Sequence, residues 1–284
     1  VDMMPWRANI QQATYDCLAC HATSMTQGIP GHTVRSVLAS YDGSVDSQRE
    51  SFITDDRSPF HERWGGWYVT GLHGEMRHMG NAYLRGGTLD TKANGNRSNV
   101  RDEFDSSNYL SPHSDIVALM VLEHQTKMHN TMVRADFSVR QWLHEASLIE
   151  PTDESKQEWQ LQLQLIAKEV VDRLLFCYEV RLTSEVKGSI VFANDFVERG
   201  PQDEQGRSLR QFDLQTRLFK YPLSFLIYSD AFDSLQPCLR KEIYRQLHQV
   251  LSDANQSADY QHLSRQARSD ALAILRATKD DLPF

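Results

Sequence analysis

The sequence lacks long apolar runs, carries no excess of positive charge and has little cysteine. Its longest apolar stretches, such as residues 116–122, are short against the roughly 20 residues of a membrane-spanning helix. The net charge of −8 argues against the basic face that nucleic-acid binding usually requires. We therefore expect a soluble protein that neither spans a membrane nor binds nucleic acid.

The four cysteines are too few and too unevenly spaced for a disulfide framework. Cys177 lies in an apolar stretch and is predicted to be a small buried side chain, although a Cys177–Cys238 disulfide stays open in an oxidising compartment. No signal peptide is recognisable at residues 1–4. Because the numbering starts at a valine, a removed signal and a trimmed chain both explain this.

One short motif carries most of the functional information. Residues 17–21 read Cys-Leu-Ala-Cys-His, the C-x-x-C-H pattern of c-type haem attachment. Two thiols on one helical turn can reach both vinyl groups of a haem, and the adjacent His21 can then bind the iron. The motif thus predicts one covalent haem c held by Cys17, Cys20 and His21. Because attachment takes place outside the cytoplasm, we expect a periplasmic or exported protein.

Two other chemistries use closely spaced cysteines. A thioredoxin-like pair needs a preceding buried strand, whereas residues 5–13 are predicted to be helical, with Pro5 at a first helical position. A zinc site needs a second Cys or His pair at a similar spacing, and the sequence has no other Cys pair. Zinc binding and thiol redox chemistry remain the alternatives to haem.

The motif and the Gly-Ile-Pro-Gly segment at 28–31 resemble the start of a cytochrome c domain. Further segments resemble a poorly characterised family of large exported bacterial proteins with a cytochrome c domain; they are residues 63–71, 122–125, 206–210 and 217–222. This resemblance implies an export route and an enlarged cytochrome fold. The family offers no established reaction that could be transferred to this chain.

The sixth ligand of the iron is the main open question. All eight methionines and eight of the eleven histidines lie within the first 132 residues, which places the haem environment in that half. The leading candidates are Met79, some sixty residues after the motif, its neighbour His78, and His124 on a predicted helix that starts at Ser111-Pro112. Weaker candidates are Met76, His73, His129 and His32. A histidine on an apolar helix face is more often a hydrogen-bonded core residue than a ligand.

The fold class that we expect is mainly α. Residues 1–110 are predicted to form a cytochrome c-like haem-binding part, and residues 111–284 a large helical elaboration packed against it. Helices are predicted near residues 5–21, 113–147, 151–178, 239–251 and 260–277. A short strand is predicted at 67–70 and a long surface loop at 85–111. Trp64 and Trp67 are expected either on a haem face or in an aromatic core corner.

The sequence predicts an exported monohaem cytochrome that transfers electrons to an unknown redox partner protein. The alternative is a peroxidase-like haem enzyme or a small-molecule haem sensor, whose sixth ligand is open or displaceable. The helical mass beyond a minimal cytochrome favours this alternative. A third hypothesis is a subunit whose haem serves a larger complex.

Overall fold

The computed structural model describes residues 17–40, 42–45, 49–92, 94–148 and 152–284. In these residues the fold is largely helical, as the sequence predicts. The α-helices are α1 (Leu18–His21), α2 (Ile116–Ser147), α3 (Asp153–Leu174), α4 (Ile190–Glu198), α5 (Asp230–Asp233), α6 (Pro237–Leu251) and α7 (Arg265–Thr278). The 3₁₀ turns are η1 (Ser24–Thr26), η2 (Phe60–Glu62), η3 (Phe225–Tyr228) and η4 (Ala258–Tyr260).

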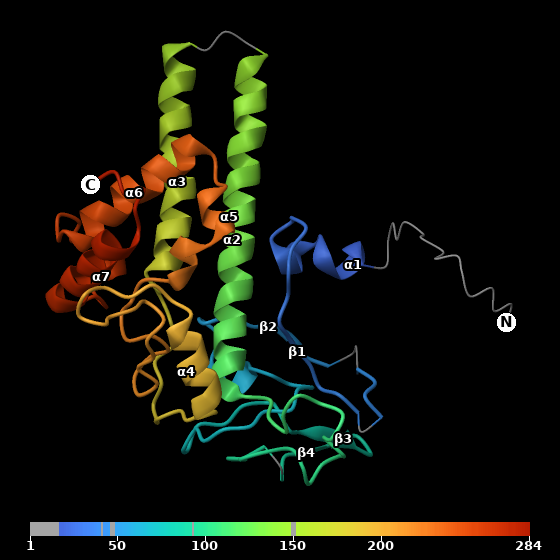
Figure 1. Ribbon diagram of the computed structural model, residues 1–284. Helices are drawn as coiled ribbons and strands as arrows, with labels where there is room; N and C mark the ends of the chain where they lie inside the picture. Colours follow the sequence, from blue (N-terminus) through green and yellow to red (C-terminus); the bar gives the residue numbers. More distant parts are fainter. Residues whose placement is uncertain (1–16, 41, 46–48, 93, 149–151) are drawn as a thin grey trace, which may run out of the picture.

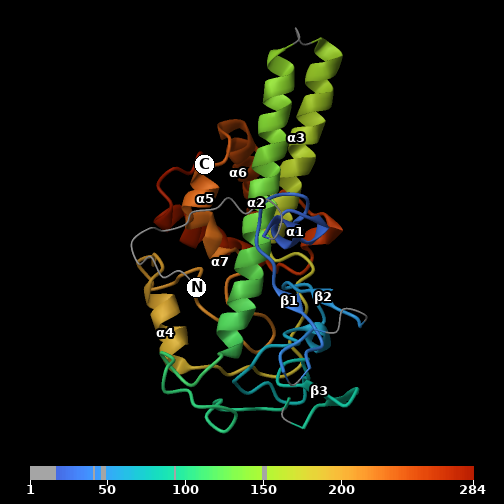
Figure 2. The same cartoon turned by 90° about the vertical axis from the view of Figure 1, so that its right-hand side faces the viewer.

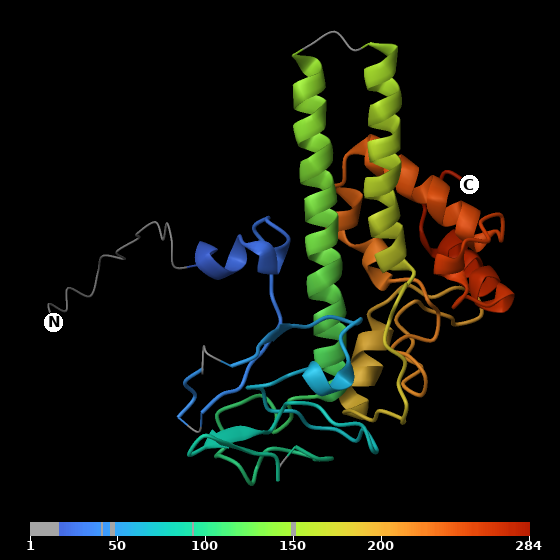
Figure 3. The ribbon, with the colours of Figure 1, turned by 180° about the vertical axis from the view of Figure 1, so that it is seen from behind.

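Helices α2 and α3 form a long antiparallel hairpin whose upper end projects beyond the rest of the molecule (Figure 1, Figure 3). The two helices are joined near that end by Trp142 and Trp159, whose stacked rings have centroids 3.4 Å apart. Each helix starts at a capping side chain: Asp115 accepts a hydrogen bond from the Ala118 N–H, and Thr152 accepts one from the Ser155 N–H. The hairpin is the frame on which the other elements pack.

The C-terminal helices cover one side of this hairpin. Helix α6 packs against α3, and α7 packs against α6. The buried residues of α6, such as Leu239, Ile243, Leu247 and Val250, recur at three- and four-residue steps and are fully buried, so they form one apolar stripe. Helix α4 lies beside the lower part of α2 (Figure 1, Figure 2).

The N-terminal segment lies on the other side of α2 and consists mainly of loops (Figure 2). Strand β1 (Arg35–Ser36) pairs antiparallel with β2 (Phe52–Ile53), and β3 (Tyr83–Arg85) pairs antiparallel with β4 (Thr88–Asp90). The prediction of a strand at 67–70 is wrong. There Val69 donates its N–H to the Asn81 side chain, and Thr70 makes only an isolated bridge to Asp115, so no ladder forms.

Several predicted boundaries shift. Helix α2 begins at Ile116 after Asp115, not at Ser111-Pro112, because the Asp115 carboxylate provides the cap. Hairpin β3–β4 extends into the predicted loop 85–111, and helix α4 was not predicted. The part of the predicted helix before residue 17 lies outside the described residues. Cys177 is buried as expected, and both Cys177 and Cys238 are free thiols.

One hydrophobic cluster runs through the molecule, from Trp64 and Val69 in the N-terminal segment to Ile274 and Leu275 in α7. It therefore includes residues on both sides of position 110, and the division into two parts stays a prediction. Within the described ranges, every helix is too short or too polar to cross a bilayer.

We expect Asp115→Ala to lower the free energy of unfolding by about 2 kcal/mol. The change removes the acceptor for the Ala118 N–H at 2.9 Å and the acceptor for the Ser189 N–H, so it loosens both the start of α2 and the segment before α4. Urea denaturation measures the loss. Asp280→Ala, at an exposed aspartate, is the matched control and should leave stability unchanged; equal effects of the two variants would contradict this cap.

Candidate functional site

The attachment motif lies on a single helical turn. Cys17 is the N-cap of α1, and its carbonyl accepts hydrogen bonds from the N–H groups of Cys20 at 3.3 Å and His21 at 3.0 Å. Both thiols are free and exposed. Because residues three apart are neighbours on a helix surface, the two sulfur atoms are available on one turn, directly before the histidine.

The His21 ring is held by the loop that follows it. Its Nδ1 is 2.8 Å from the Gly31 carbonyl oxygen, and the Gly31 N–H donates back to the His21 carbonyl at 2.8 Å. Since a carbonyl only accepts, Nδ1 donates this hydrogen bond, and in the neutral ring Nε2 then carries the lone pair. A second nitrogen bound to a backbone carbonyl is the usual arrangement of metal-ligating histidines.

Glycine is required at position 31 because a helix residue approaches it closely. A Cβ there would lie 2.5 Å from Asn130 Oδ1. The Asn130 side chain binds the backbone of His32 on both sides: it accepts from the His32 N–H at 3.0 Å and donates to the His32 carbonyl at 2.6 Å. Helix α2 thereby fixes the end of the loop that follows His21.

His21 lines a cavity of 420 Å³ between this loop and α2. Its apolar walls come from both halves of the chain and consist of Val34, Trp67, Leu122 and Leu226. The Trp67 ring is fixed by a hydrogen bond from Nε1 to the Arg35 carbonyl at 2.9 Å, whereas Trp64 is fully buried in the core. The sequence left open whether this tryptophan pair lies on a haem face or in the core. In the structure Trp67 lines the cavity and Trp64 lies in the core.

Two more histidines line the same cavity. The rings of His32 and His129 have centroids 5.4 Å apart, and within the described part of the chain neither ring nitrogen of either residue has a hydrogen-bond partner. Burial, with a smaller contribution from His32, lowers the pKa of His129. The cavity therefore joins the motif histidine to two imidazoles with free nitrogens.

The structure does not bring the leading sixth-ligand candidates to this cavity. His124 is buried, with Nδ1 donating to Asp56 Oδ2 at 3.1 Å and Nε2 bonded to Ser224 Oγ at 2.7 Å. Both of its nitrogens are occupied, as in a core histidine. On α2 it lies in a buried stripe with Val117, Met120 and Met128.

His78 and Met79 lie elsewhere in the N-terminal segment, and His78 is part of a cluster of aromatic rings. The buried His78 ring packs against Trp64 at 5.5 Å and against His73 at 4.8 Å between centroids. Burial lowers the pKa of His78 to about 3. The Met79 sulfur accepts a hydrogen bond from Ser36 Oγ at 3.6 Å. Neither residue lines the cavity of His21.

A buried charged cluster adjoins the other side of α2, and no local sequence pattern indicates it. Arg173 of α3 bonds Asp55 at 3.1 Å and Asp56 at 2.6 Å. Arg63 bonds Glu123 of α2 at 3.1 Å and also donates to the Asp56 carbonyl at 3.2 Å. Partners more than a hundred positions apart, such as Asp56 and Arg173, leave no spacing that sequence inspection could recognise.

The pKa values of two acids in this charged cluster, Asp56 and Glu123, are shifted in opposite directions. Burial alone raises the pKa of Asp56, but the hydrogen bond from His124 and the charges of His124, Arg173 and Arg63 outweigh it, so the pKa is lowered. Burial dominates at Glu123 and raises its pKa to about 7, although Arg63 opposes the shift. Asp56 is therefore the charged centre of the cluster.

Among the described residues, no group of three or more His, Cys, Asp or Glu side chains is arranged to hold a metal ion. Comparison of the chain with protein-family models, with curated proteins and with solved structures finds no match.

We expect Asp56→Asn to lower the free energy of unfolding at neutral pH by about 3 kcal/mol. The change removes the closer of the two carboxylates that pair with the buried Arg173, at 2.6 Å, and leaves only Asp55 at 3.1 Å. The folded-state pKa of Asp56 lies below its ordinary value of 3.8. Its stabilising contribution is therefore complete above that value and is lost as the pH falls below it. Urea denaturation between pH 7 and pH 3 should show the wild type converging on the variant.

The exposed Asp280 provides the matched control, since Asp280→Asn should follow the wild type at every pH. A stability difference between wild type and Asp56→Asn that stays constant down to pH 3 would contradict the role of Asp56.

Proposed function

We propose that this chain is an exported monohaem c-type cytochrome that transfers electrons, with its haem in the cavity lined by His21, His32 and His129. The observation that carries the proposal is the His21 ring. Its Nδ1 is tied to the Gly31 carbonyl at 2.8 Å, which leaves Nε2 for a metal, and the motif cysteines stand one turn away. The cytochrome c-like character of residues 1–110 is part of this proposal.

The residues present suit a haem. Cys17 and Cys20 would bind it covalently, and His21 would provide one axial nitrogen. Trp67, Leu122 and Val34 offer the apolar surface that a porphyrin needs. When bound, haem c supplies a reversible one-electron iron couple.

For the sixth ligand we propose His129. It extends from the middle of α2, whose backbone is fixed by packing on both sides, and its ring nitrogens have no partner in the described part of the chain. His32 would then pack against it, held through its backbone by Asn130. Two histidine ligands give a lower potential than His/Met ligation.

We expect the protein, exported together with haem-maturation machinery, to show a low-spin c-type absorption spectrum. Because His129 fills the sixth site, carbon monoxide should leave the spectrum of the reduced protein unchanged. The Cys17→Ala/Cys20→Ala double variant should carry no covalent haem. Covalent haem in that variant would overturn the attachment, and a shift on adding carbon monoxide would favour an enzyme or a sensor instead of electron transfer.

We expect His129→Ala to convert the iron to a high-spin form that binds carbon monoxide, while covalent attachment persists. His32→Ala should remain low-spin, and so should His144→Ala, which removes an exposed histidine from the same helix. The spectra of the three reduced variants decide the ligand. A low-spin spectrum of His129→Ala that does not respond to carbon monoxide would rule out His129.

A further inference from the structure

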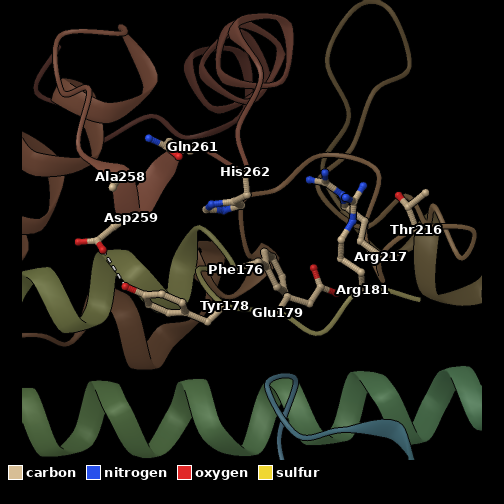
Figure 4. Close-up of a pocket in the computed structure, with 10 residues that line it drawn as sticks. All are labelled: Phe176, Tyr178, Glu179, Arg181, Thr216, Arg217, Ala258, Asp259, Gln261 and His262. Atoms are coloured by element: carbon tan, nitrogen blue, oxygen red, sulfur yellow. Dashed lines mark hydrogen bonds between the residues drawn. The ribbon is translucent and has the colours of Figure 1, made fainter. Parts of the chain in front are cut away.

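A second cavity, of 460 Å³, lies in the helical half of the chain (Figure 4). Its walls are the segment 176–181 after α3, the turn at 216–217 and the segment 258–262 around η4. None of the residues that line it also lines the cavity of His21. It is somewhat larger than the cavity of His21, and the proposed electron transfer makes no use of it.

Two arginines dominate the charge of this second cavity. Figure 4 shows the side chains of Arg181 and Arg217 pointing the same way on one side of it, with His262 on the other. Within the described ranges neither guanidinium forms an ion pair with an acidic side chain. By contrast, most other arginines that line the cavities described here form an ion pair with an acidic side chain. Arg173 pairs with Asp55, for example, and Arg134 pairs with Glu169.

The acids of the second cavity do not cancel these charges. Asp259 already accepts a hydrogen bond from the Tyr178 hydroxyl at 2.7 Å and pairs with Lys168 at 2.9 Å. The Glu179 carboxylate accepts the Leu218 N–H at 2.9 Å. Burial raises its pKa to about 7, although the charge of Arg217 opposes the shift, so Glu179 offsets that charge only in part. A protonated Glu179 is neutral and can donate a hydrogen bond to an oxygen of a ligand.

The backbone that forms this wall is strained. Phe176 and Tyr178 both adopt left-handed conformations, with φ of 54° and 69°, which bulky non-glycine residues rarely adopt. Such strain persists only where the surroundings hold it and is concentrated at binding sites. Here the Phe176 ring is held by stacking on His124, with centroids 4.4 Å apart, and Phe176 is one of the residues that line the cavity.

We propose that this cavity binds a small organic anion, a carboxylate or a phosphate ester, whose oxygens are held by Arg181 and Arg217. Guanidinium groups present N–H donors in a planar fork that matches both carboxylate and phosphate oxygens. Phe176 and Tyr178 provide an aromatic surface for the carbon skeleton of the ligand. The site is independent of the haem, so the proposal does not rest on the proposed electron transfer.

Calorimetric titration of the full chain with succinate and with inorganic phosphate tests this site. We expect at least one of the two probes to bind, and Arg181→Gln and Arg217→Gln each to weaken its affinity by about tenfold or more. The matched control is Arg276→Gln, which removes the same charge from an exposed position on α7 and should retain wild-type affinity.

The two probes distinguish the ligand classes, since binding of succinate alone indicates a carboxylate ligand and binding of phosphate alone a phosphate ester. Far-ultraviolet circular dichroism confirms that each variant folds, which we expect because Arg181 is exposed and Arg217 only partly buried. The proposal is overturned if neither probe binds the wild type. It is equally overturned if Arg181→Gln and Arg217→Gln bind like Arg276→Gln.

Discussion

The pairing of Asp56 with Arg173 and His124 determines how the two halves of this chain fit together. A buried charge that loses its partner costs several kcal/mol, so the loop that carries Asp56 has only one favourable position against α2 and α3. Arg63 and Glu123 form a second buried ion pair at 3.1 Å beside it. In the described residues of the N-terminal segment the strands are only two or three residues long, and these charged contacts help to hold that segment against α2 and α3.

The same charged cluster orients α2 toward the cavity of His21. Glu123 and His124 face the charges, whereas Leu122, Thr126 and His129 line the cavity. Positions 122, 126 and 129 follow one another at helical steps and so share a face. Rotation of α2 about its axis would break the contacts of Glu123 with Arg63 and of His124 with Asp56. These contacts therefore determine which face of α2, and with it His129, points toward the cavity.

The helices and the attachment motif could be predicted from the sequence, because both depend on local spacing. In α2, for example, Val117, Met120 and His124 recur at three- and four-residue steps and are all buried. The wall opposite His21 could not be predicted, since the contact of His32 with Asn130 joins residues 98 positions apart. The strand expected at 67–70 failed for the related reason that an alternating pattern does not reveal whether a partner strand exists.

The proposed electron transfer requires an iron atom bound to His21 Nε2. Anomalous diffraction at the iron edge, from crystals of the mature protein, would locate such an atom directly. We predict a single iron peak in the cavity lined by Trp67 and Leu122, bonded to His21 on one side and to His129 on the other. A peak beside His78 or Met79, or the absence of iron next to His21, would contradict the account.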